Sequence, residues 1–263
     1  AHNLKVGGSN PSPATKLLKM NLSKIFQKNN YIQTIFFISF FLTPIFFLVG
    51  NFAINFLYIF ISIIFLIGLL TKKIYFNLKD YSFYLLIFLF FSFVVNLLFS
   101  NDFSLTFPRV IKFITIILFI VSFKYSLNFF KINKIQKLYE FWSIVFLIVT
   151  IDLVYEIIFG ENIFGFKSNL PGRLSSFTGD EMIIGHYFSA FVLITLSTIH
   201  LKFKNIKIDF FFIIFFICIS FLIGERSNFI KTILIISVFT LFVHKIKFRY
   251  ALSFLIIFII FFS

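Results

Sequence analysis

Apolar segments alternate with short polar connections along almost the whole chain. Most of the segments approach the length of about 20 residues that crosses the hydrocarbon core of a bilayer as a helix. They are continuously apolar, unlike the alternating strands of a membrane β-barrel. The pattern predicts an all-α polytopic membrane protein with about nine transmembrane helices. The predicted spans are 32–49, 52–70, 82–99, 110–127, 139–159, 182–201, 208–223, 229–243 and 250–263.

Lysines are concentrated in every second connection between these spans. Because such residues mark cytoplasmic loops, the pattern predicts a cytoplasmic N-terminus and lysine side chains that contact anionic lipid. The external connections are then those near 50–51, at 100–109, at 160–181 and at 224–228. The lysine-rich connections contain Lys16, Lys19, Lys24 and Lys28, then Lys72, Lys73 and Lys79, then Lys131, Lys134 and Lys137, then Lys202, Lys204 and Lys207, and last Lys245, Lys247 and Arg249.

The two ends of the chain differ from the part between them. Residues 1–19 form a polar segment with glycine and proline before Met20, and we interpret them as upstream translation or as a disordered cytoplasmic tail. Residues 20–263 form a single transmembrane domain with no internal repeat. Because the ninth span stops at Ser263 without a polar tail, we expect the chain to be the N-terminal part of a longer protein.

The composition agrees with a membrane protein, since 60% of the 263 residues are hydrophobic and 13% are charged. The formal net charge of +14 would also suit a nucleic-acid partner. The lysines, however, follow the connections between spans, so we expect no nucleic acid. Cys218 is the single cysteine, which excludes a disulfide or a cysteine metal site within one chain.

Arginine is distributed differently from lysine. Three of the four arginines, Arg109, Arg173 and Arg226, lie on the predicted external side. The planar guanidinium fork matches phosphate oxygens, so these arginines suggest a phosphate or pyrophosphate clamp. The alternative is that each extends to the outer headgroups or pairs with a neighbouring acid.

Two carboxylates lie in the outer half of the fifth predicted span. Asp152 and Glu156 are four residues apart and therefore share one helix face. Charges within a span face a protein interior or a water-filled cavity, and two like charges need a partner such as Arg173. A structural salt bridge between helices is the alternative to a catalytic role for Asp152.

The sixth predicted span begins with a possible capping box. Thr178 would be the N-cap and Glu181 the residue that reaches back to it, at a helix end that also favours phosphate. Glu181 is therefore either a cap or a catalytic group. His186, one turn further on, is either a hydrogen-bonded structural residue or a base. No metal-ligand spacing and no phosphate-cradling glycine loop occurs, so we expect no cofactor.

Three short motifs follow one another on the predicted external side. They are Asp152–Gly160 followed by Asn162–Phe166, then Gly172–Phe177 running into Asp180, Glu181 and Gly185, and last Gly224–Ser227. In this order they resemble bacterial O-antigen polymerases and O-antigen ligases over roughly residues 140–235.

The resemblance implies a multi-pass protein of the bacterial inner membrane that takes part in lipopolysaccharide biosynthesis. Such a glycosyltransferase moves a glycan from an undecaprenyl-pyrophosphate carrier on the periplasmic face, without nucleotide or metal. In a polymerase the acceptor is another lipid-linked repeat unit, and in a ligase it is the lipid A core or a protein. Other membrane proteins of polysaccharide assembly are the expected partners.

The resemblance also suggests roles for the polar residues. Arginines would stabilise the departing pyrophosphate, and a carboxylate or histidine would deprotonate the acceptor hydroxyl. The alternatives from other classes are a transporter for lipid-linked sugars and an anchoring subunit without chemistry. The candidate substrate-binding residues are Arg173, Arg226, Arg109 and Glu225, and the candidate catalytic residues are Glu181, Asp152 and His186.

Overall fold

The computed structural model describes residues 30–72, 74, 81–179 and 183–244, and all regular structure in these ranges is helical. The helices are α2 (Asn30–Phe41), α3 (Thr43–Val49), α4 (Asn51–Leu70), α5 (Tyr81–Leu98), α6 (Phe103–Phe129), α7 (Ile132–Phe159), the 3-10 helix η1 (Ser176–Thr178), α8 (Ile184–Phe203), α9 (Ile206–Leu222) and α10 (Arg226–Val243).

Six of these helices are long and apolar enough to cross a membrane, and the bent pair of α2 and α3 makes a seventh if it is one span. The predicted all-helical fold, with several apolar helices long enough to span a membrane, is therefore confirmed for the described residues. The count of nine is not, because α9 has only 17 residues and the predicted span 250–263 lies outside the described residues. The segment 1–19 also lies outside them.

The break between α2 and α3 follows from a proline. Pro44 has no N–H and its ring crowds the carbonyl four residues earlier, so the chain bends by 48° between the two helices. That carbonyl belongs to Phe40, and it accepts a hydrogen bond of 2.9 Å from the indole N–H of Trp142 on α7. A side chain of α7 thus replaces the backbone bond that the proline removes, and it fixes the first span against the fifth.

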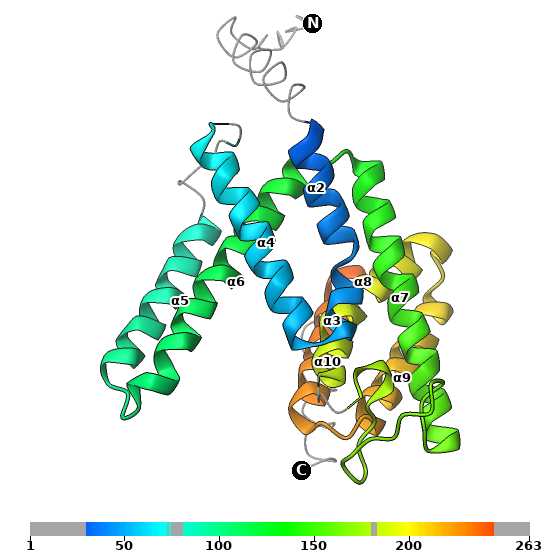
Figure 1. The fold of residues 1–263 in the computed structure, drawn as a ribbon. Helices are drawn as coiled ribbons and strands as arrows, with labels where there is room; N and C mark the ends of the chain where they lie inside the picture. The colour runs from blue at the N-terminus through cyan, green and yellow to red at the C-terminus, as the bar shows by residue number, and fades with distance from the viewer. Residues whose placement is uncertain (1–29, 73, 75–80, 180–182, 245–263) are drawn as a thin grey trace, which may run out of the picture.

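The helices run up and down between two ends of the molecule (Figure 1). The connections from α4 to α5 and from α6 to α7 lie at one end, which we call the lysine end because Lys72 and Lys131 lie there. The connections from α3 to α4 and from α5 to α6 and the long loop after α7 lie at the opposite end, which we call the loop end. The alternation of lysine-rich and lysine-poor connections thus corresponds to two separate ends of the bundle.

The site described below belongs to the part formed by α7, α8, α9 and α10. Phe146 of α7 is fully buried there, with ring centroids 4.9 Å from Phe188 of α8 and 5.3 Å from Phe216 of α9. Aromatic pairs at such distances add to the stabilisation from burial alone. By contrast, α5 has no buried residue and packs against α6 at the side of the molecule (Figure 1). An apolar helix exposed in this way suits a lipid environment.

The start of α6 lies at the loop end. Asp102 is its N-cap, and its Oδ1 accepts hydrogen bonds from the Ser104 hydroxyl at 2.7 Å and the Leu105 amide at 3.2 Å. These two bonds hold the pKa of the Asp102 carboxyl below its usual range. Arg109 follows on the same helix, which packs chiefly against α2, α4 and α5.

Candidate functional site

The site begins with a buried group of carboxylates and serines at the end of α7, which we call the serine cluster: Asp152, Glu156, Ser175 and Ser176. Asp152 is completely buried, and its Oδ2 accepts a hydrogen bond of 2.6 Å from the Ser176 hydroxyl. Its Oδ1 accepts one of 2.9 Å from the amide of Ile163. Glu156 accepts bonds of 3.0 Å and 2.7 Å from the amides of Ser175 and Ser176. The cluster thus fastens the loop after α7 onto the end of that helix.

The sequence had suggested an arginine as the partner of the two carboxylates. The donors that the structure gives for the two carboxylates are backbone amides and serine hydroxyls of the loop. Ser176 has a left-handed φ of 47°, which costs a non-glycine residue free energy and is sustained by these bonds. Asn162 adds a further brace, since its amide donates to the carbonyl of Ser176 at 2.7 Å. The two carboxylates thus hold the loop in place against the end of α7.

The far side of this loop is docked onto the turn between α9 and α10. The amide of Leu174 donates to the carbonyl of Ile223 at 3.3 Å. Gly224 has a φ of 81°, and a Cβ built there would lie 2.5 Å from the carbonyl oxygen of Gly172 and 3.3 Å from Cγ of Arg173. Only glycine combines this backbone conformation with so close an approach. The docked loop brings Arg173 to the ends of α8 and α10.

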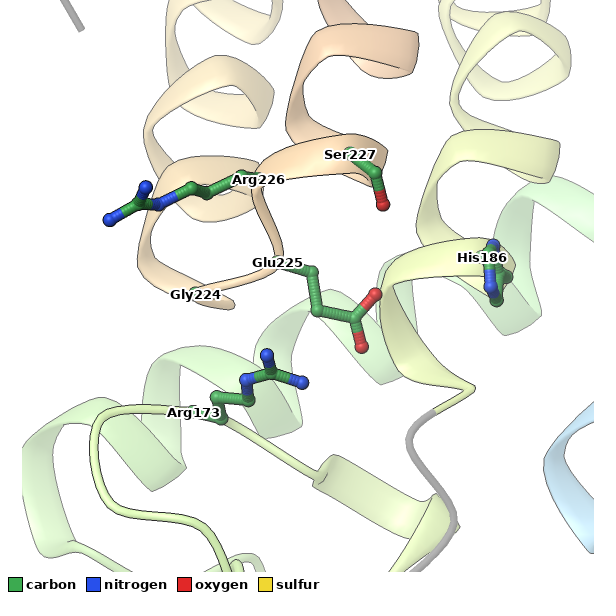
Figure 2. Close-up of a pocket in the computed structure, with 6 residues that line it drawn as sticks. All are labelled: Arg173, His186, Gly224, Glu225, Arg226 and Ser227. Atoms are coloured by element: carbon green, nitrogen blue, oxygen red, sulfur yellow. The ribbon is translucent and has the colours of Figure 1, made fainter. Parts of the chain in front are cut away.

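A pocket of about 420 Å³ opens between the docked loop and the first turns of α8 and α10 (Figure 2). In Figure 2 the guanidinium of Arg173 points toward the carboxylate of Glu225, and the side chain of Arg226 extends away from both. The imidazole of His186 lies on the other side of Glu225. The lining residues are Arg173, His186, Gly224, Glu225, Arg226 and Ser227.

A second glycine allows α8 and α10 to meet behind this pocket. A Cβ on Gly185 would collide with the carboxylate of Glu225 and would lie 2.8 Å from the amide nitrogen of Asn228. Asn228 is only 2% exposed, and its amide donates to Oε2 of Glu225. The approach of the two helices therefore fixes the Glu225 side chain against the first turn of α8.

The structure brings four of the seven candidate residues together at this pocket: Arg173, His186, Glu225 and Arg226. Asp152 lies in the serine cluster instead, and Arg109 lies on α6, outside the pocket lining. The prediction for Glu181 falls on a residue outside the described ranges.

The predicted N-cap at Thr178 is wrong. Helix α8 begins at Ile184 with Ile183 as its N-cap, and Thr178 belongs to η1. The Thr178 hydroxyl donates to the carbonyl of Ser175 at 2.7 Å. The loop backbone therefore provides an acceptor that the capping pattern did not take into account.

The sequence analysis missed Gly185, Asn228 and Lys231 as parts of the site. A usable signal was present, since Glu225, Asn228 and Lys231 are three residues apart at the start of an apolar helix. Residues three apart lie close together on a helix surface, so this spacing predicts contact between neighbouring side chains. The ammonium of Lys231 does donate to the Asn228 carbonyl oxygen at 3.1 Å.

Another polar cluster joins the last turn of α8, the first turn of α9 and the end of α10, and we call it the imidazole cluster: His200, Asp209 and His244. Asp209 of α9 is fully buried, and its Oδ2 lies 2.6 Å from Nδ1 of His200 and 3.4 Å from Nε2 of His244. Its Oδ1 has no hydrogen-bond partner among the described residues. Within the described ranges, no three such side chains are arranged to hold a metal ion.

The pocket combines groups that bind anions with groups that move protons. Guanidinium groups bind phosphate oxygens with paired hydrogen bonds, and an imidazole or a carboxylate can accept a proton from a hydroxyl. No known protein family, curated protein or solved structure matches this chain. Inferences about function therefore rest on the side chains themselves and on their position in the bundle.

Proposed function

We propose that this chain belongs to a membrane glycosyltransferase that joins undecaprenyl-pyrophosphate-linked oligosaccharide repeat units, as an O-antigen polymerase does. The observation that carries the proposal is the pocket that is lined by Arg173 from the loop, by Glu225 and Arg226 at the start of α10, and by His186 of α8. Two arginines from separate segments suit a pyrophosphate, which carries several negative charges on neighbouring oxygens. The adjacent imidazole and carboxylate suit a sugar hydroxyl.

The position of the pocket supports the same proposal. It lies at the loop end, whereas Lys72 and Lys131 lie at the opposite end of the bundle. By the positive-inside rule the lysine end is the cytoplasmic one, so the pocket faces the outside of the cytoplasmic membrane of a bacterium. Undecaprenyl-pyrophosphate-linked units displayed on that side reach such a pocket from the lipid.

The reaction assigns each group one task. The acceptor hydroxyl attacks the anomeric carbon of the donor glycan, and the bond from that carbon to the pyrophosphate oxygen breaks. The pyrophosphate leaves with the bonding electrons, and Arg173 and Arg226 stabilise the charge that develops on it. His186 takes the proton of the acceptor hydroxyl, while Glu225 orients Arg173 and the acceptor.

The test uses purified protein in detergent with a lipid-linked repeat unit as both donor and acceptor. Loss of one well-placed donor to a developing oxyanion costs about 10²–10³ in kcat, so Arg173→Ala and Arg226→Ala should each slow chain lengthening by that factor. Arg109→Ala is the matched control, because Arg109 is an exposed arginine outside the pocket lining. It should leave the rate within about threefold, since surface changes cost little.

Unchanged lengthening in Arg173→Ala and Arg226→Ala, at equal expression, would refute the clamp. Transfer of the glycan to lipid A core or protein without lengthening would identify a ligase. Movement of the lipid-linked unit across a vesicle membrane without any new glycosidic bond would identify a transporter. Each of these results would contradict the proposal that the protein is a polymerase.

A further inference from the structure

We propose that Asn228 and Lys231 are positioning residues for Glu225, and that they act as a chain of hydrogen bonds along the first turns of α10. This inference rests on the proposed function of the pocket. Neither residue lines the pocket itself, so each would act on the reaction only through Glu225.

The chain has a defined direction. The ammonium of Lys231 donates to Oδ1 of Asn228 at 3.1 Å, and Nδ2 of Asn228 donates to Oε2 of Glu225. An ammonium has donors only, so the oxygen of the Asn228 amide must face Lys231. The nitrogen then faces Glu225. Lys231 therefore determines which atom the amide presents to the carboxylate.

The surroundings of Asn228 prevent it from taking another position. Asn228 is 2% exposed, and the backbone of Gly185 on α8 leaves no room for even a methyl group beside its amide nitrogen and the Glu225 carboxylate. An enclosed amide of this kind is a rigid support for a neighbouring catalytic or binding group.

The consequence concerns the orientation of Glu225. Asn228 holds Oε2 on the side of α8, which leaves the carboxylate facing Arg173 as Figure 2 shows. Without Lys231 the Asn228 oxygen loses the ammonium that donates to it, so the amide is held less firmly in the position from which it donates to Glu225. The Glu225 carboxylate would then keep its orientation toward Arg173 for a smaller share of the time.

The variant that tests this is Lys231→Met, because Lys231 is exposed and methionine preserves the apolar part of its side chain. We expect kcat for chain lengthening to fall about five- to tenfold, the size of one ordinary hydrogen bond, with KM within about twofold. Lys231→Arg should restore most of the rate. In a Glu225→Gln background Lys231→Met should cause no further loss.

Lys112→Met is the matched control, since Lys112 is an exposed lysine of α6 outside the pocket lining. It should change neither kcat nor KM. An equal loss from Lys231→Met in the wild-type and Glu225→Gln backgrounds would overturn the proposal, because Lys231 would then act independently of Glu225. An unchanged kcat would overturn it as well.

An inactive wild-type protein would refute the proposed function alone, so a second measurement tests the link between Lys231 and Glu225 without any activity. The melting temperatures of Lys231→Met, Glu225→Gln and the double variant form a thermodynamic cycle. We expect each single variant to lower the melting temperature by about 1–3 °C, and the double variant to lower it by no more than one of them. Additive shifts would show that Lys231 and Glu225 are not linked.

Discussion

The serine cluster and the imidazole cluster solve the same physical problem with different donors. Each buries carboxylate groups in the bundle, which is costly unless hydrogen bonds replace the lost water. In the serine cluster the donors are amides and hydroxyls of one loop, held at 2.6–3.2 Å from Asp152 and Glu156. In the imidazole cluster the Nδ1 of His200 lies 2.6 Å from Oδ2 of Asp209, whereas Oδ1 of Asp209 and Nε2 of His244 have no hydrogen-bond partner among the described residues.

The difference shows what each cluster is suited to do. Backbone amides cannot turn away from a carboxylate unless the chain itself moves, so the serine cluster fixes the loop that carries Arg173. Imidazoles are side chains, and that of His200 is 32% exposed, so it can exchange its bond to Asp209 for one to water. The serine cluster is thus built for a fixed geometry, whereas the imidazole cluster tolerates rearrangement.

The largest expected effect comes from Glu156→Ala. It removes the acceptor of the Ser175 and Ser176 amides, and each buried donor left without a partner costs about 1–3 kcal/mol. We therefore expect a loss of about 3–5 kcal/mol in the free energy of unfolding, measured by denaturant or thermal unfolding in detergent. Tyr155→Phe, a change at the neighbouring exposed side chain, should be nearly neutral. A loss below 1 kcal/mol for Glu156→Ala would contradict the assignment of the cluster as the anchor of the loop.

Asp209→Asn should lower the free energy of unfolding by less than Glu156→Ala does. The asparagine keeps the shape of the side chain but loses the charge, and a hydrogen bond to a charged group is worth about 1.5–3 kcal/mol. Because His200 can reach water, we expect the lower half of that range in the same unfolding measurement. Lys207→Met, an exposed change on the same helix, is the control. If Asp209→Asn destabilised the protein more than Glu156→Ala, the imidazole cluster would be the more rigid of the two.

The helices themselves could be predicted from the sequence because span length and hydropathy are local properties. Eight of the predicted spans coincide with α2 to α10, and the connections that contain Lys72 and Lys131 lie apart from the loop end. The count of nine and the orientation stay predictions. The bend at Pro44 was missed, because the spans were drawn from average hydropathy, which a single proline within an apolar segment barely changes.

The candidate site was harder to predict, since its contacts join residues far apart in the chain. The sequence selected Arg173, His186, Glu225 and Arg226, but not the loop docking that assembles them. The sequence did not indicate that a loop backbone would supply donors to Asp152 and Glu156, because a one-dimensional pattern does not show which loop folds back onto a helix end. The Thr178 cap failed for a related reason: the carbonyl of Ser175 accepts its hydroxyl.

Gly224→Ala tests how closely the loop held by the serine cluster is docked at its other end. Both Gly224 and Gly165 have a φ of 81°, so alanine at either position costs about 1–2 kcal/mol for the left-handed backbone. A Cβ at Gly165 meets nothing within 4 Å, whereas at Gly224 it would lie 2.5 Å from the backbone oxygen of Gly172. Since that oxygen belongs to the backbone, it cannot move aside without shifting the loop.

The difference between Gly224→Ala and Gly165→Ala therefore isolates the close approach from the cost of the dihedral angle. We expect Gly224→Ala to cost about 1–2 kcal/mol more in the free energy of unfolding, in the range found for overpacked sites. The extra cost should vanish in a Glu156→Ala background, because a loop released from the serine cluster can retreat from Gly224. Equal losses of unfolding free energy for the two alanine variants in the wild-type background would mean that the loop can move away from Gly224 without cost. The contrast between a fixed serine cluster and an adaptable imidazole cluster would then not hold for the loop that positions Arg173.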